Sequence, residues 1–397
     1  EKFANVELAD FTDEQIEAFI NNWFGKDSIK AKSCWEKLKR SENRPIKELA
    51  STPLLLTLLC IAFDESMDFP KNRAEIYEDA INALLRKWDV SRNIERDEIY
   101  KNLSNKRKES MFSRIAAETF AKEQFFIPHQ TIEGQIAKFI ENLPEARQET
   151  LEPDSAVILK SIEAQHGIFV ERAHGIYSFS HLTIQEYFTA KFLVDNASKG
   201  TLKGLVENHL TDDRWREVFL ITAGTLEDAD SFLLMMKQQT DSLLTDDKIT
   251  DFLWQIQKIV DKNQDKYEPL ALRSFAIYLA LDFTFTIAVA IVSARDRVLA
   301  YDLARDLAYD LARDLVSVRR DSDLVSDLVS DLVSDLVSDL VRDLDTNQKR
   351  LLINYLKATK LLVDCLNTDC YVSKGTRQKI WDSLLTVPED QKTGFQP

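Results

Sequence analysis

The stretch IFVERAHGIYSFSHLTIQEYFTA, residues 168–190, decides the fold that we predict for this chain. Apolar residues alternate with others in residues 168–172 and again in 176–179, and Gly175 lies in the short loop between them. This pattern is typical of a β-hairpin. A helical pattern precedes the hairpin at residues 155–165, and another follows it. A helix, a small hairpin and a second helix are the outline of a winged-helix unit.

Helix signals also occur upstream of this unit. Thr12 and Gln15 have the spacing of a capping box, and Gly25 is placed to end the helix that they begin. Pro53 opens the apolar run of residues 53–63, which we expect to be a buried helix because its apolar residues lie on nearly every side. Further helices are predicted at residues 72–88, 111–126, 212–220 and 251–260. Helices therefore dominate the predicted fold.

Composition limits the classes of protein to consider. The chain has 397 residues, of which 44% are hydrophobic, and only 9 Gly and 9 Pro, which favours a compact, mostly helical protein. Its net charge of -15 argues against unspecific binding to nucleic acids or anionic membranes. Four widely spaced cysteines and no signal peptide indicate reduced thiols in a cytoplasmic protein without zinc. The abrupt start without Met suggests a fragment of a longer chain.

One apolar stretch, residues 275–293, is long enough to span a membrane. Asp282 lies near its centre, where a carboxylate costs about 2.5–3.5 kcal/mol on insertion. We expect a buried helix in a helical array, with membrane embedding as the alternative.

An exact four-residue repeat follows, with Asp at every fourth position in residues 302–314 and 323–343. A period of four drifts by about 40° per repeat on a helix, which argues against a coiled coil. We predict a helix in two or more pieces. Residues 323–341 contain five Asp and no Lys or Arg, so this part should be marginally stable. A tandem expansion with only a scaffold role is the simplest interpretation.

The chain contains no complete catalytic motif. Gly25 and Lys26 are the only Gly-Lys pair that resembles a P-loop, but Ile20 stands where the upstream Gly is required, and a helix precedes the pair. We therefore reject a P-loop and expect no ATP hydrolysis by this chain alone.

A winged helix could also read DNA. The helix predicted before the wing, residues 155–165, carries one Lys and one Glu, and the wing itself offers only Arg172 and His174. Phosphate contacts need Lys or Arg, so DNA recognition by this unit is not favoured.

Several motifs together resemble the NACHT-type NTPases of the STAND class. FSHLTIQEYFTA at residues 179–190 resembles their winged-helix segment, and STPLLL at 51–56 resembles the Pro-containing motif of their first helical domain. FPKNRAEIY at 69–77 is similar to the rest of that helical domain. RWREVF at 214–219 and the Asp repeats resemble the C-terminal helical domain of bacterial members.

The resemblance implies roles for two residues. His181 would touch the β-phosphate of bound ADP and hold the resting state, and Pro53 would pack on the adenine. A His at the start of a helix can donate to a phosphate held by the free N–H groups there. The alternatives are a plain helix-start or core histidine and a plain helix-start proline. Ser51 and Thr52 replace the Gly or Asn that is usual before the Pro, which weakens the second assignment.

The resemblance further implies four parts. Residues 1–11 would be the end of a truncated NTPase domain, because 3–11 read as a strand, and 12–108 a helical domain that ends in a basic loop. Residues 109–197 would form the winged-helix domain and 198–397 a C-terminal helical domain.

Together these observations predict the regulatory part of a bacterial NACHT NTPase, a nucleotide-controlled signalling switch in antiphage defence. Its full-length parent would bind ADP or ATP with Mg, whereas this fragment would hold no cofactor. The expected partners are the upstream NTPase domain and, on activation, further copies of the chain, with no nucleic acid or membrane. A helical scaffold without a nucleotide role and a winged-helix transcription regulator remain as alternatives.

Overall fold

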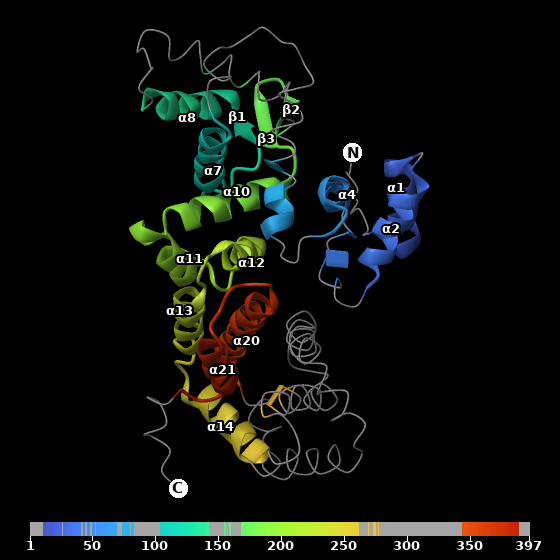
Figure 1. Ribbon diagram of the computed structural model, residues 1–397. Helices are drawn as coiled ribbons and strands as arrows, with labels where there is room; N and C mark the ends of the chain where they lie inside the picture. Colours follow the sequence, from blue (N-terminus) through green and yellow to red (C-terminus); the bar gives the residue numbers. More distant parts are fainter. Residues whose placement is uncertain are drawn as a thin grey trace, which may run out of the picture. The chain divides into compact units, whose positions relative to one another are not determined.

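A computed structural model describes about three fifths of the chain (Figure 1), which divides into two compact units that we treat separately. One unit contains residues 1–199 and 220–225, and the other contains 200–219 and 226–397. The described stretches are residues 11–25, 27–40, 53–69, 104–142, 168–261 and 344–388, with shorter pieces at 43, 46–47, 50–51, 74–79, 81–82, 155, 159, 269, 273–274 and 277.

The first unit begins with helix α1 (Asp13–Phe24), and both of its predicted end signals are confirmed. Thr12 and Gln15 form the capping box, in which each side chain bonds the other residue's backbone N–H. Gly25 ends the helix with a positive φ of 55°. Helix α2 (Ser28–Leu38) follows.

Helix α4 (Pro53–Ser66) starts at Pro53, as predicted. Leu58, Leu59 and Phe63 are buried, which agrees with the expected buried helix. Cys60 lies beside Cys34 of α2, and a hydrogen bond to that thiol, together with burial, raises the pKa of Cys60 well above its ordinary value. All four cysteines are buried thiols without disulfides.

The helix predicted at residues 111–126 is placed differently in the structure. Helix α7 runs over Asn105–Ala121, so the basic segment before Met111 forms its first turns instead of a loop. Ser104 caps it by accepting from the Arg107 backbone N–H at 3.3 Å. This serine cap marks the start of the helix. The apolar periodicity could not locate that start, because the first turn is polar and basic.

The winged-helix sheet has three antiparallel strands in the order β1–β3–β2. Strands β2 (Phe169–Ala173) and β3 (Ile176–Phe179) form the predicted hairpin. Strand β1 (Ile127–Pro128) pairs with β3 on the side opposite β2, and it was not predicted. Two residues are too few to produce an alternating pattern.

Helices cover this small sheet. Helix α8 (His129–Glu141) follows β1, and α10 (Leu182–Asp195) follows β3 and packs along α7 (Figure 1). Aromatic rings join these elements: Phe112 of α7 contacts Phe169 of β2 at 6.0 Å and Phe188 of α10 at 5.4 Å between centroids. Of the predicted helix at 155–165, the structure describes residues 155 and 159, and both are helical and buried.

The second unit is helical throughout its described part. The 3-10 turn η2 (Ala197–Lys199) ends the main stretch of the first unit. The second unit contains α11 (Thr201–His209), the 3-10 turn η3 (Asp213–Trp215), α13 (Asp230–Asp241), α14 (Asp247–Asp261), α20 (Thr346–Asn367) and α21 (Lys374–Ser383). Helix α12 (Arg216–Thr225) belongs to both units, because its residues 220–225 group with the first. The predicted helix at 212–220 thus begins as a 3-10 turn and becomes α-helical at Arg216. The predicted helix at 251–260 is longer at its N-terminal end.

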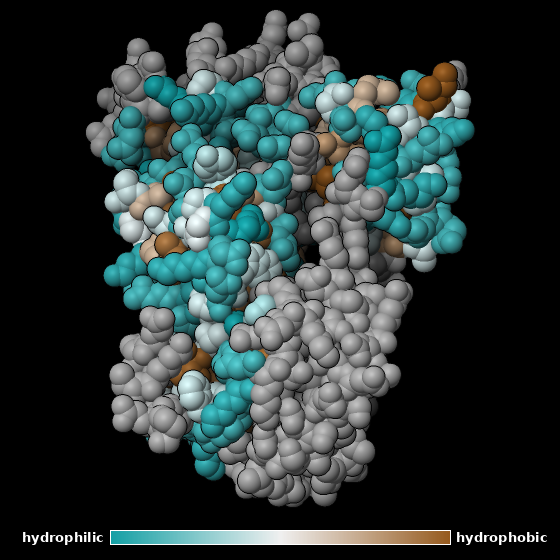
Figure 2. Space-filling model, turned by 60° about the horizontal axis from the view of Figure 1, so that its bottom comes forward, coloured by the Kyte–Doolittle hydropathy of each residue, from teal (hydrophilic) through white to brown (hydrophobic). Residues whose placement is uncertain are grey.

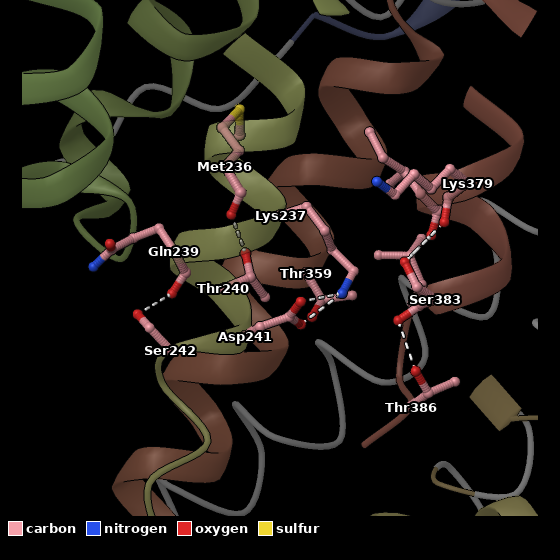
Figure 3. Close-up of polar contacts among 12 residues, drawn as sticks. Met236, Lys237, Gln239, Thr240, Asp241, Ser242, Thr359, Lys379, Ser383 and Thr386 are labelled. Atoms are coloured by element: carbon pink, nitrogen blue, oxygen red, sulfur yellow. Dashed lines mark hydrogen bonds and ion pairs between the residues drawn. The ribbon is translucent and has the colours of Figure 1, made fainter. Parts of the chain in front are cut away.

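Polar contacts within and between these helices satisfy several of their charged groups. Asp364 of α20 accepts from Arg216 and from Lys360, each at 2.8 Å. Within α13, Lys237 is buried and donates to Asp241 at 2.6 Å, while Thr240 donates to the Met236 carbonyl (Figure 3). These pairs satisfy charges that would otherwise be costly to bury.

Three predicted segments lie outside the described residues. They are the strand at 3–11, apart from Phe11, nearly all of the apolar stretch at 275–293, and the Asp repeats. Among the helices that the structure describes, none is long and apolar enough to cross a membrane. On the face shown in Figure 2 the described surface is mainly hydrophilic, with apolar atoms in small separate patches.

Candidate functional site

The junction between β3 and α10 contains the strongest candidate, His181. Its backbone is extended, with φ -145° and ψ 150°, and its side chain caps α10. The ring Nδ1 accepts from the Thr183 backbone N–H at 3.3 Å and lies 2.9 Å from the Thr183 hydroxyl oxygen. A histidine thus takes the place that Ser, Thr, Asp or Asn usually occupies at an N-cap.

This cap fixes which ring nitrogen carries the proton. Because the Thr183 N–H donates to Nδ1, the neutral His181 ring carries its proton on Nε2. Burial lowers the pKa of His181, and the nearby positive charge of Arg172 lowers it further. The ring is therefore neutral near pH 7 and presents one N–H donor, on Nε2, that no hydrogen bond within the described part of the chain uses.

The residues around His181 hold it firmly. Phe179 at the end of β3 is buried against Phe169, with 4.5 Å between ring centroids. The next residue, Ser180, donates its backbone N–H to the Ile168 carbonyl at 2.8 Å. The first residue of α10, Leu182, is 43% exposed, so the start of the helix is open to solvent on one side.

This arrangement can bind an anion. The Thr183 and Ile184 N–H groups already donate to the ring and the carbonyl of His181, so it is the dipole of α10 that favours negative charge at this helix start. The His181 Nε2–H adds a side-chain donor, and Arg172 adds positive charge. A phosphate is the group that this combination suits best.

Pro53, the second predicted residue, is the first residue of α4 and is exposed. Its carbonyl accepts from the Thr57 hydroxyl at 3.0 Å, as in an ordinary helical turn. This geometry fits a plain helix-start proline. No interaction among the described residues joins Pro53 to His181.

A second cluster of ionisable groups lies between α7 and α10. Lys191 is 3.7 Å from Glu109, and Glu78 and Asp195 add negative charge nearby. Burial raises the pKa of Glu109, against the attraction of Lys191. Burial also raises the pKa of Tyr187, with the negative charge of Glu109 next in effect.

Sequence reasoning missed this cluster because its members come from three separate elements. Charged residues in amphipathic helices are normally assigned to the solvent-exposed face. The described ranges contain no group of three His, Cys, Asp or Glu side chains that could hold a metal ion.

The sheet with its helices α7, α8 and α10 defines a winged-helix domain. Residues 73–193 match the family model of the winged helix-turn-helix domain C-terminal to NACHT. Residues 327–387 match the model of NACHT C-terminal helical domain 2. A search of curated proteins gave no match.

The chain therefore contains the C-terminal winged-helix and helical regions of a NACHT-type protein. The resemblance predicted from residues 179–190 is confirmed, because they lie within the first match. The mostly helical fold class, with a small sheet in the winged-helix region, is confirmed as well.

Proposed function

We propose that this chain is the regulatory part of a bacterial NACHT NTPase that works as a nucleotide-controlled switch in antiphage defence. In this proposal ADP, bound by an upstream NTPase domain, holds the helical and winged-helix domains in the resting state. Exchange for ATP with Mg releases them and permits assembly into oligomers. The domain boundaries proposed from the sequence, at residues 12, 109 and 198, and a cytoplasmic location belong to the same proposal.

His181 carries the proposal. Its Nδ1 caps α10, so its Nε2–H is left as a donor that no hydrogen bond within the described residues uses, at a helix start whose dipole favours a phosphate. Contact with the β-phosphate of ADP would make the position of the winged-helix domain depend on the bound nucleotide. Pro53, exposed at the start of α4, would pack on the adenine.

The first test concerns His181 in the protein that includes its NTPase domain. His181→Ala removes both the helix cap and the phosphate donor. It should speed the release of ADP and raise the signalling activity that the protein shows without a trigger. A hydrogen bond to a charged group contributes about 1.5–3 kcal/mol, so retention should fall by roughly 10- to 150-fold. Release of a fluorescent ADP analogue measures this directly.

His181→Asn is the matched control, because Asn is a favourable N-cap residue whose shorter side chain does not reproduce the imidazole Nε2 donor. It should keep the stability of the wild type and still lose ADP quickly. If His181→Asn retains ADP as the wild type does, the helix cap and not the phosphate contact explains the role of His181.

A second test concerns this chain alone. It should hydrolyse no ATP, because it contains neither a P-loop sequence nor the Mg²⁺ ligands that support phosphoryl transfer. A coupled phosphate-release assay on the purified chain provides the measurement. Turnover that EDTA abolishes would contradict this assignment and show a nucleotide site that the motifs do not reveal.

A further inference from the structure

Arg172 lies in a bulge of strand β2. The β2–β3 ladder shifts register between Glu171 and Ala173, so Arg172 is left without a pairing partner on β3. A bulge of this kind bends the strand and redirects the side chain of the extra residue. The position of the Arg172 side chain is therefore set by the bulge and not by the regular alternation of the strand.

Two hydrogen bonds hold the redirected guanidinium. Its Nε donates to the Ser178 hydroxyl oxygen and its Nη2 donates to the Ser180 carbonyl, each at 2.9 Å. The Ser178 hydroxyl is fixed in turn, because it donates to the Phe179 carbonyl at 2.7 Å. The guanidinium is thus held at the end of β3, and its bond to Ser180 places it directly before His181 in the chain. Its Nη1 makes no hydrogen bond within the described residues.

This position puts two positive features close together. Arg172 is the one charged group whose field shifts the pKa of His181, and it does so downward. The start of α10, which His181 caps, is the positive end of a helix dipole. An anion placed beside both features would be attracted by the fixed cation and by the positive helix end.

The neighbouring carboxylate does not supply that anion. Glu171 accepts from the Gly175 backbone N–H at 2.7 Å and so faces the turn of the hairpin. The anion that the arrangement favours must therefore come from outside the described part of the chain.

We infer that Arg172 is a second contact for the phosphate that His181 binds, with the Nη1 of Arg172 and the Nε2 of His181 donating to different oxygens of a diphosphate. This inference rests on the proposed function of His181 and adds a residue for which nothing in the sequence pattern provides a role. A guanidinium presents planar, directional donors that suit phosphate oxygens, and being always charged it binds them at any physiological pH.

The test uses inorganic pyrophosphate as a probe on this chain, followed by NMR of labelled histidine side chains. The chain has 5 histidines, so few signals need to be assigned. His174 at the wing tip is fully exposed and serves as an internal reference. Added pyrophosphate should shift the His181 signal and raise its pKa, and should leave the His174 signal in place.

Arg172→Gln should weaken pyrophosphate binding about tenfold, which corresponds to ~1.4 kcal/mol. Arg172→Lys keeps the charge and loses the forked geometry, so its affinity should fall between those of the wild type and Arg172→Gln. Arg114→Gln is the matched control, because Arg114 is exposed on α7 and the substitution makes the same change in net charge. It should bind within about twofold of the wild type.

The outcomes separate the two proposals. If Arg172→Gln binds as Arg114→Gln does while His181→Ala is impaired, the role of Arg172 is overturned and that of His181 stands. If Arg172→Gln is impaired and His181→Ala is not, the phosphate role of His181 is overturned, and with it the shared site inferred here. Absence of any shift at His181 in the wild type overturns both.

Discussion

Gly175 in the hairpin turn is a residue whose replacement has a clear expected cost. It has a positive φ of 71°, and a Cβ added there would lie 2.9 Å from Nδ1 of His129. Its carbonyl also accepts from the His129 backbone N–H at 2.8 Å, so the turn cannot move away easily. Gly175→Ala should destabilise the first unit by about 2–4 kcal/mol, the sum of left-handed strain and a steric contact. Thermal unfolding gives the measurement.

Gly25→Ala separates the backbone strain from the steric contact. Gly25 also has a positive φ, of 55°, but a Cβ there would meet only the Asn22 carbonyl at an ordinary 3.9 Å. This variant should lose only the strain, about 1 kcal/mol. Equal losses in the two variants would show that the His129 contact relaxes at no cost.

At the scale of single residues, the sequence predicted that His181 and Pro53 lie at helix starts, but not which contacts their side chains make. The start of a helix after a hairpin was visible in the pattern, and so was Pro53 as a first helical residue. Which ring nitrogen of His181 is engaged depends on its contact with Thr183, a matter of side-chain orientation. Arg172 could not be assigned a role, because a one-residue shift in strand register leaves no trace in residue types.

At the scale of elements, the packing of α10 along α7 buries an acid whose ionisation should weaken the fold. The pKa of Glu109 is raised, chiefly by burial, so the folded state holds its proton more tightly than the unfolded state does. The associated stability is fully present below the ordinary value of 4.5 and is lost as the pH rises through the higher folded-state pKa. Unfolding followed by urea titration across this range measures the loss.

Glu109→Gln should remove this part of the pH dependence and unfold at a higher urea concentration at pH 7. Glu118→Gln is the control on the same helix, because Glu118 is exposed and pairs with Lys122 at the surface. It should leave the pH profile unchanged. A loss of stability at pH 7 in Glu109→Gln alone would contradict this and mean that the ion pair with Lys191 outweighs the cost of burying Glu109.

Elements with strong local signals were predicted well, and those defined by distant partners were not. The capping box of α1 and the hairpin β2–β3 appear in the structure as the sequence indicated. Strand β1 exists because Ile127 and Pro128 pair with β3, about fifty residues further along the chain. The early start of α7 had a local signal in Ser104, but its basic first turn has the composition of a loop.

At the scale of the whole molecule, two compact units with separate cores should unfold in two transitions. Asp364→Ala removes the carboxylate that Arg216 and Lys360 share and should destabilise the second unit by about 1–3 kcal/mol, because water can solvate the half-exposed Arg216 side chain. Ile136→Ala opens a cavity beneath α8 and should cost the first unit about 2–4 kcal/mol. Calorimetry should show each variant lowering a different transition.

A single transition that both substitutions lower would contradict this expectation and indicate that the units unfold as one. The expected loss in Asp364→Ala follows from the charges around this carboxyl. Burial alone would raise the pKa of that carboxyl, but the positive charges of Lys360 and Arg216 hold it below its ordinary value. The carboxylate is therefore ionised in the folded state, and its removal takes away the negative charge to which Lys360 and Arg216 both donate.

The bulge in β2 has a consequence for how related chains should vary in length. Because Arg172 is the residue by which β2 exceeds its partner, a chain with this position deleted could keep the whole ladder, the turn at Gly175 and the cap at His181. Such a deletion would remove the guanidinium without altering any other side chain. We therefore expect that relatives with a gap of one residue in the wing bind pyrophosphate more weakly than relatives that keep the guanidinium.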